Sequence, residues 1–235
     1  MTHDKQRPLQ PIGPLVDSIP ADRPQREAIT GRFVTVAPLD PASHGPSLFD
    51  AIGGLENTDL WYYLQSGPFP ERAAFETYLA NRARSIDPLA FSILDSRSGD
   101  ALGFAVYMRI EPLHRVMEVG SVVLAKRLQR TSGATEAMFL MARHAFEGLR
   151  YRRYEWKCNA LNERSRRAAH RLGFTFEGVF RSHMISKGRS RDTAWFALLD
   201  SEWPARKAAF EQWLHPDNFT RDGKQRVALG ECHGR

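Results

Sequence analysis

The sequence lacks the features that mark disulfide-rich, zinc-binding or membrane-spanning proteins. Only two of its 235 residues are cysteines, Cys158 and Cys232, and no C-x-x-C pair is present. We therefore expect neither a framework of several disulfides nor a zinc ribbon or thioredoxin-type site. The eight histidines have no metal-ligand spacing, so no metal site is expected. No run of about 18 apolar residues is available to cross a membrane. The first 20 residues lack the apolar core of a secretory signal, so the expected location is the cytoplasm.

The composition is that of a folded globular protein, but its charge is unevenly distributed. Apolar residues make up 42% and charged residues 26% of the chain, which excludes whole-chain disorder, collagen and coiled coil. Residues 126–191 hold 16 Lys and Arg against 5 Asp and Glu, whereas the rest of the chain holds 17 against 22. Such a basic block favours an anionic ligand. The alternatives are the phosphates of a small cofactor, a nucleic acid, or merely the solvated faces of helices.

The pattern of strands and helices predicts one mixed α/β domain. Residues 1–30 contain five prolines and read as a leader, residues 31–214 as a single domain, and residues 215–235 as a polar tail. Alternating or continuous apolar runs predict strands at 32–36, 90–95, 101–110, 116–124 and 154–158, and a hairpin of 175–185 with 192–199. Helical spacing and end signals predict helices at 42–52, 70–85, 131–148 and 162–172. A helix therefore crosses over between strands near the middle of the domain.

The turn between the strand at 116–124 and the next helix is a candidate anion site. That helix begins with the small residues Thr131-Ser132-Gly133-Ala134. The N–H groups of a helix's first turn point outward beside the positive end of the helix dipole. This arrangement suits a pyrophosphate, although an ordinary loop before a helix has the same composition.

Three blocks in the same order resemble the GCN5-related N-acetyltransferase (GNAT) family, and more narrowly its ribosomal-protein N-acetyltransferase-like branch. The first is the strand at 118–120 followed by the turn and Ala-Thr-Glu-Ala at 134–137. The second is an Asn-x-x-Ser helix start at 162–165 that closes with Arg-Leu-Gly-Phe at 171–174. The third runs from Arg-Asp at 191 to Glu-Trp at 203 and is similar to the family's terminal strand.

This resemblance implies both a fold and a co-substrate. The implied fold is a mostly antiparallel central sheet with one parallel, splayed strand pair, flanked by helices. The implied co-substrate is acetyl-CoA, whose pantetheine arm and phosphates would lie against the splayed strand, the turn and the second helix. The implied cofactor-binding residues are Val122, Val123, Leu124, Gln129, Arg130, Thr131, Ser132, Gly133, Ala134, Thr135, Asn162 and Arg171.

The same resemblance, with the residue types present, gives candidates for the chemistry. The ribosomal branch offers Ser165 as the acid for the leaving thiol, and the alternative for Ser165 is a small residue on a packed helix face. Glu118 is the only carboxylate inside the central strand, which makes it a candidate proton acceptor for the amine or, alternatively, an ion-pair partner of an arginine. The family's insertion after the first strand flanks the acceptor site, so Trp61, Tyr63 and Phe69 are candidate acceptor-binding residues or core residues.

Two positions depart from the family pattern. Ser132 stands where the pyrophosphate loop usually has glycine, and the alternative register, which restores Gly133, ends in Thr135. If the loop needs a positive φ at this position, Ser132 carries strain that glycine avoids. Ala169 stands where many members have the tyrosine that protonates the leaving thiolate.

The leading functional hypothesis is transfer of acetyl from acetyl-CoA to a primary amine, by direct attack in a ternary complex. The acceptor is a protein N-terminus or a small molecule, and ten acidic against five basic residues between positions 40 and 111 favour a cationic one. The alternatives are a catalytically silent acyl-CoA-binding protein and a basic nucleic-acid-binding module. The absence of a recognised nucleic-acid-binding motif disfavours the last. A homodimer is compatible with the sequence.

Overall fold

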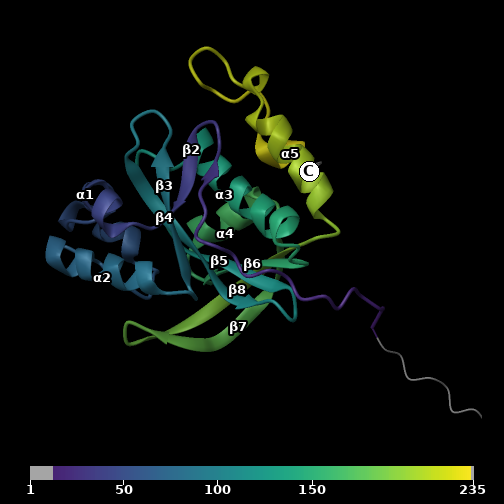
Figure 1. Cartoon of the computed structure of the whole chain (residues 1–235), viewed down its shortest axis with the longest axis horizontal. Coiled ribbons are helices and arrows are strands. Elements are labelled where there is room, and N and C mark those ends of the chain that lie inside the picture. The colour runs from purple at the N-terminus through teal and green to yellow at the C-terminus, as the bar shows by residue number, and fades with distance from the viewer. Residues whose placement is uncertain (1–12, 234–235) are drawn as a thin grey trace, which may run out of the picture.

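The computed structural model describes residues 13–233, and its core is one eight-stranded sheet covered by helices (Figure 1). The strands are β1 (Ile29–Thr30), β2 (Val34–Pro38), β3 (Leu89–Asp95), β4 (Ala101–Glu111), β5 (Val116–Leu124), β6 (Arg153–Asn159), β7 (Thr175–Ser186) and β8 (Arg189–Leu199). The α-helices are α1 (Pro41–Ile52), α2 (Arg72–Arg84), α3 (Ser132–Arg143), α4 (Glu163–Arg171), α5 (Trp203–Leu214) and α6 (Leu229–Cys232). The shorter helical turns are η1 (Leu55–Trp61), η2 (His144–Gly148) and η3 (Pro216–Asn218).

The sheet is antiparallel except at one pair of strands. Its order is β1-β2-β3-β4-β5-β6-β8-β7, and only β5 and β6 run parallel. Their pairing covers Val116–Val119 of β5 and ends at the pair Val119 and Trp156, although both strands continue. Beyond that point β5 bulges against β4, and Ser121 takes a positive φ of 47°. The predicted mixed fold with a parallel, splayed strand pair is therefore confirmed.

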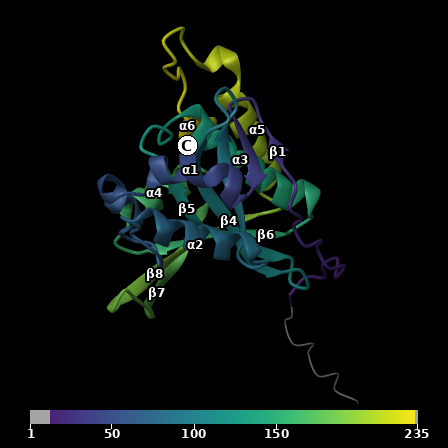
Figure 2. The same cartoon turned by 60° about the vertical axis from the view of Figure 1, so that its left-hand side comes forward.

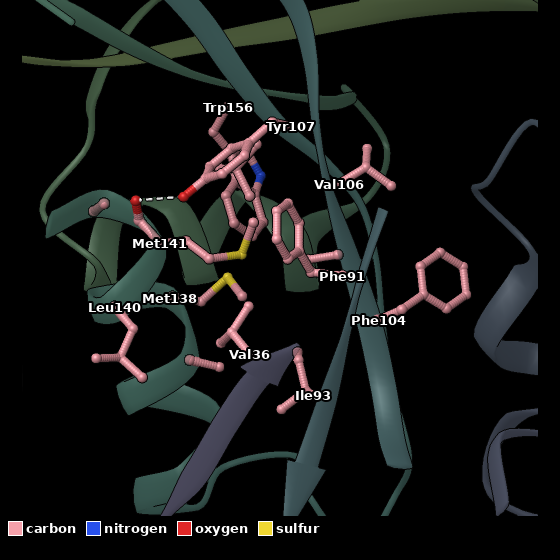
Figure 3. Packing of buried hydrophobic residues seen from close by; sticks show 14 of the residues in the cluster. Val36, Phe91, Ile93, Phe104, Val106, Tyr107, Met138, Leu140, Met141 and Trp156 are labelled. Atoms are coloured by element: carbon pink, nitrogen blue, oxygen red, sulfur yellow. Dashed lines mark hydrogen bonds between the residues drawn. The ribbon is translucent and has the colours of Figure 1, made fainter. Parts of the chain in front are cut away.

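Helices cover both faces of the sheet. Figure 1 shows α1 and α2 side by side next to the sheet and α3 with α5 on its other side. In Figure 3 the side chains of Met138 and Met141 reach from α3 toward those of the strands, while Phe104 points the other way. Tyr107 is fully buried and donates a hydrogen bond from its hydroxyl to the carbonyl of Met141 at 2.8 Å. The sheet is thus fixed against α3, which carries the candidate anion site at its first turn.

One buried carboxylate, that of Glu136, connects α3 to the edge of the sheet. Glu136, in the Ala-Thr-Glu-Ala block, is buried, and its carboxylate accepts hydrogen bonds from the backbone N–H groups of Arg32, Phe33 and Val34 at 2.9, 2.6 and 2.9 Å. Buried carboxylates are stable only when such donors satisfy them. Glu136 therefore ties α3 to the turn between β1 and β2.

Two parts of the chain differ from the sequence-based expectation. Helix α5 was not predicted, although Trp203, Phe210 and Trp213, all buried, recur at helical spacing. The residues taken for a polar tail include η3, α6 and a buried Leu229, and they pack against α5. Of the predicted leader, residues 1–12 lie outside the described residues, and the remainder contains β1.

Candidate functional site

The splay between β5 and β6 opens into a long cleft of about 1690 Å³. A pocket for one drug-sized ligand has roughly 300–1,000 Å³, so this cleft has room for a large cofactor and a second molecule. It is lined from one side by α3 and α4, and its walls reach both the hairpin β7–β8 and the segment after α5. Figures 1 and 2 place that hairpin and the C-terminal segment at opposite ends of the molecule, so the cleft has two distinct ends.

The first turn of α3 forms one wall of the cleft. Thr131 is the N-cap, and its hydroxyl accepts a hydrogen bond from the N–H of Ala134 at 3.2 Å. The N–H groups of Ser132 and Gly133 precede the first intrahelical acceptor, as at any helix start. The positive φ of the loop falls on Arg130, at 62°, and not on Ser132, which is the first residue of the helix. The strain that the sequence placed on Ser132 is therefore absent, and serine fits there without penalty.

Gly133 does not line the cleft. A Cβ at this position would lie 3.0 Å from Cγ1 of Val34 and 3.3 Å from Cδ1 of Leu128. Close packing of α3 on β2 therefore explains the glycine, and a role of Gly133 in cofactor binding is left to its backbone N–H group. The other predicted residues of the loop, listed here together, do line the cleft: Gln129, Arg130, Thr131, Ser132, Ala134 and Thr135.

The wall of β5 beyond the last pair with β6 also lines the cleft. Val122, Val123 and Leu124 are all part of this wall, and Val123 and Leu124 pair with β4 on their other side. The carbonyl of Leu124 accepts a hydrogen bond from Nε2 of Gln129 at 2.9 Å. Gln129 therefore closes the loop onto the strand.

Arg171, at the end of α4, is held close to the first turn of α3. Both of its terminal nitrogens donate to Oγ1 of Thr135 at 3.1 Å, and its guanidinium lies 5.0 Å from the ring centroid of Trp213 in α5. Burial lowers the pKa of Arg171 from its ordinary value, but an arginine remains charged at neutral pH. A fixed cation thus faces the cleft beside the helix N-terminus, an arrangement that suits a phosphate group.

The start of α4 contributes Asn162 and Ser165 to the same cleft. Asn162 is the N-cap, and its Oδ1 accepts a hydrogen bond from the N–H of Ser165 at 3.1 Å. The hydroxyl of Ser165 accepts a hydrogen bond from Nε1 of Trp156 at 2.9 Å, which leaves its own proton to donate. Ser165 lies beside the buried thiol of Cys158; burial raises the pKa of that thiol, and the contact with Ser165 opposes the rise.

Ala169, which stands where many family members have a tyrosine, packs in the core. Ala169 is fully buried, and the cleft is lined by its neighbour Ala168 instead. A side chain at position 169 of this chain points to the core, so the departure removes no group from the cleft.

Glu118 belongs to a buried ionic cluster on neighbouring strands. Its side chain is 4% exposed and its Oε2 contacts Nη1 of Arg109 as well as Nζ of Lys157, the latter at 3.1 Å. Lys157 is equally buried, contacts Oε2 of Glu155 at 2.6 Å, and lies 3.8 Å from the ring centroid of Trp195. Glu118 is therefore an ion-pair partner, one of the two sequence-based alternatives, and it also lines the cleft; its role as proton acceptor stays a prediction.

The three predicted acceptor-binding aromatics separate into two groups. Trp61 is 1% exposed, donates from Nε1 to the carbonyl of Ile52 at 2.7 Å, and packs edge-on against Phe69. Neither Trp61 nor Phe69 lines the cleft. Both pack beside α2, where Tyr78 meets Trp61 edge-on and lies tilted against Phe69, so the structure favours the core alternative for these two residues. Tyr63 does line the cleft.

The end of η1 and the segment after it are hydrogen-bonded to the opposite lip of the cleft, which is formed by the residues before α4 and by the hairpin β7–β8. The hydroxyl of Tyr63 donates to the carbonyl of Leu161 at 3.2 Å, and Nζ of Lys187, in the tip of the hairpin β7–β8, donates to the carbonyl of Trp61 at 2.8 Å. A third contact joins Nε2 of Gln65 to the sulfur of Met184 at 3.6 Å. These three hydrogen bonds span this end of the cleft.

Several cleft residues were not identified from the sequence. Arg109, Lys157 and Arg191 come together through the register of β4, β5, β6 and β8. No local pattern marks Arg109 or Lys157, and Arg191 begins the third block of the resemblance without being predicted as a site residue. Trp213 and Phe219 reach the cleft from the C-terminal segment. Their aromatic character in a polar stretch was the available signal. Between residues 13 and 233 no helix has the length and apolarity to cross a bilayer, and no three His, Cys, Asp or Glu side chains are grouped as metal ligands.

Comparisons with known proteins agree with this geometry. The model of the acetyltransferase (GNAT) domain matches residues 36–175, more than half of the chain. The crystal structure of a GCN5-related N-acetyltransferase from Brucella melitensis is 44% identical, with a TM-score of 0.91 over 93% of this chain and 99% of that chain. A probable GNAT-family acetyltransferase from Chromobacterium violaceum is 40% identical, with a TM-score of 0.77 over 85% and 100% of the two chains.

A curated relative extends the comparison to a shorter region. The Bacillus subtilis protein named "Putative ribosomal N-acetyltransferase YdaF" is 28% identical over 109 residues, which are 46% of this chain. The match spans 59% of that protein's length. Together with the family model and the two solved structures, the splayed strand pair and the adjoining helix start show that the chain is an acyltransferase and belongs to the GNAT acetyltransferase family.

Proposed function

We propose that the protein is an acetyl-CoA-dependent N-acetyltransferase that acts on a primary amine by direct attack in a ternary complex. The observation that carries this proposal is the cleft itself. The unpaired wall of β5, the first turn of α3 and the fixed cation of Arg171 all line one continuous space. Such a space suits an extended ligand with a polar arm and several phosphates.

The chemistry of the cleft residues suits acetyl-CoA. Backbone groups of Val122–Leu124 that face away from β4 are available to an amide-containing arm, because β6 has already diverged. The N–H groups at the start of α3, with Arg130 and Arg171 beside them, suit the pyrophosphate. Asn162 uses Oδ1 for its own helix, and its Nδ2 makes no hydrogen bond to any residue of the described range, so it is available to the arm. When bound, acetyl-CoA supplies the acetyl group as a thioester.

Two side chains are proposed for the proton transfers. Both ion pairs of Glu118 end on Oε2, which leaves Oε1 to accept a proton from the acceptor ammonium directly or through water. Ser165 accepts a hydrogen bond from Trp156, which leaves its own O–H available to donate to the leaving sulfur. A thiol leaves readily even without a strong acid, because its intrinsic pKa is about 8.5. Positioning of the two reactants is expected to supply much of the rate.

The acceptor enters at the end of the cleft that Tyr63 and the hairpin β7–β8 line. A protein N-terminus and a small-molecule amine are both compatible with this end, and the name of the Bacillus subtilis relative supports the former. We retain both acceptor classes in the proposal.

Two measurements test the proposed function. Isothermal titration of the full chain with acetyl-CoA is expected to give saturable binding in the micromolar range, and the absence of binding up to millimolar concentration would refute the proposal. A screen of amines and N-terminal peptides, followed by thiol release, is expected to identify acceptors. Binding of acetyl-CoA with no thiol release above buffer hydrolysis would instead identify a catalytically silent acyl-CoA-binding protein.

A further inference from the structure

Arg191, at the acceptor end of the cleft, contacts no carboxylate of the described residues 13–233. A chain of ion pairs crosses the sheet there, in which Arg109 and Lys157 contact Glu118 while Lys157 and Arg153 contact Glu155. Arg153 is also paired in a fork with Glu177, at 2.8 and 2.5 Å. Within residues 13–233, Arg191 makes no such contact, although it lines the same cleft.

The surroundings of Arg191 leave its donors unused. Its Nε is buried and has no hydrogen-bond partner among the described residues. The neighbouring carboxylate of Asp192 is engaged elsewhere, because it accepts a hydrogen bond from the N–H of Ser182 at 2.7 Å. An arginine carries five N–H donors in a rigid fork, and a buried donor without a partner is costly to keep. A ligand that supplies two oxygen acceptors would remove this cost.

Of the side chains of this cluster that line the cleft, three are cations, Arg109, Lys157 and Arg191, and one is a carboxylate, Glu118. Arg191 lies close enough to Glu118, Arg109 and Cys158 to interact electrostatically with each of them, and burial lowers its own pKa from the ordinary value. Glu118 is already shared between two cations. The acidic surplus of residues 40–111 suggested a cationic acceptor, whereas the side chains that line this end of the cleft favour an anionic group.

We propose that Arg191 is a specificity-determining residue, which binds a carboxylate that the acceptor carries close to its primary amine. This inference rests on the proposed N-acetyltransferase function and names its substrate class. The planar guanidinium matches a carboxylate with two parallel hydrogen bonds. The nearby cations have a second effect, because positive charges disfavour protonation of the acceptor's amine and increase its neutral, nucleophilic fraction. Arg191 binds the substrate, and Glu118 takes the proton.

Two pairs of acceptors test the proposal. They distinguish two sources of the carboxylate, the α-carboxylate of a free amino acid and the acidic first side chain of a peptide. One arm compares L-alanine with L-alaninamide, and the other compares two tetrapeptides that differ only in Asp against Asn at the first position. For each pair, kcat/KM is measured with the wild-type protein and with Arg191→Gln. Comparing the ratio of acid to amide between the two proteins cancels the intrinsic nucleophilicity of the acceptors. In at least one arm, Arg191→Gln is expected to lower this ratio about 10- to 100-fold.

The controls keep the test decisive. Arg189→Gln, an exposed arginine of the same strand that does not line the cleft, is expected to leave the ratio unchanged. Arg191→Lys keeps the charge without the fork and is expected to give an intermediate ratio, and it replaces Arg191→Gln if that variant no longer binds acetyl-CoA. A change below about threefold in both arms would overturn the inference while leaving the proposed function intact. If the wild-type protein acetylates no amine at all, both the inference and the proposed function are wrong.

Discussion

Lys157 supports a quantitative prediction about the floor of the cleft. Its ammonium group is 4% exposed and contacts Glu118 at 3.1 Å and Glu155 at 2.6 Å. Removing one partner of a buried ion pair costs roughly 3–5 kcal/mol, because the remaining charge is left uncompensated. Since Glu118 keeps Arg109 and Glu155 keeps Arg153, we expect Lys157→Met to lower the free energy of unfolding by about 3 kcal/mol, the lower end of this range.

This prediction is measured by urea unfolding at neutral pH, with the slope checked for constancy. The matched control is Lys207→Met, whose ammonium contacts Glu147 at 2.9 Å but is 34% exposed, so we expect a loss below about 1 kcal/mol. Combining Lys157→Met with Glu118→Gln removes one of the two stranded charges, and the double variant is expected to be less destabilised than the sum of the single variants. If Lys157→Met costs no more than Lys207→Met, the reasoning that a buried cluster holds Glu118 in place is wrong.

Three further predictions follow from the site and its supporting core. Arg171→Met is expected to raise the Kd for acetyl-CoA about tenfold or more in calorimetry, because a fixed cation is lost beside the start of α3, and an unchanged Kd would remove Arg171 from the cofactor site. Trp61→Ala is expected to lower the free energy of unfolding by about 3–5 kcal/mol, whereas Tyr63→Phe should change it by less than about 1 kcal/mol. Equal effects of the two variants in denaturant unfolding would contradict the assignment of Trp61 to the core and Tyr63 to the cleft. Burial lowers the pKa of His144, so the unfolded chain binds a proton more readily than the folded one, and stability is lost as the pH falls below the unfolded pKa of 6.5. His144→Gln is expected to flatten this loss of stability between pH 7 and 5. Identical pH dependence of the unfolding free energy in the two proteins would refute this prediction.

The elements of the sheet were largely readable from the sequence because their causes are local. Apolar alternation placed β3, β4 and β5 within one or two residues of their observed bounds, and the small residues before α3 placed its N-terminus. Helix α5 was missed although three buried aromatic residues repeat at helical spacing along it, since Glu202-Trp203 had been interpreted as the end of the strand block. This error came from the resemblance and not from the periodicity.

The candidate site was less predictable because its side chains meet through tertiary structure. The aromatic character of Trp61 and Phe69 is the same whether they pack in a core or line a cleft, and only burial distinguishes the two. The pairing of Glu118 with Lys157 depends on the parallel register that sets Glu118 opposite Glu155. Likewise, the buried Nε of Arg191 has no hydrogen-bond partner within the described part of the chain, and no spacing in the sequence predicts this.

The three hydrogen bonds that join the segment after η1 to the opposite lip have a consequence for the size of the acceptor. A hydrogen bond of this kind contributes only about 0.5–1.5 kcal/mol. Thermal motion therefore breaks any one of them often, while all three together keep the two lips in register. For the proposed acceptor this means that a chain end or a small amine needs at most one of these bonds to open, whereas a folded protein surface would have to break all three at once.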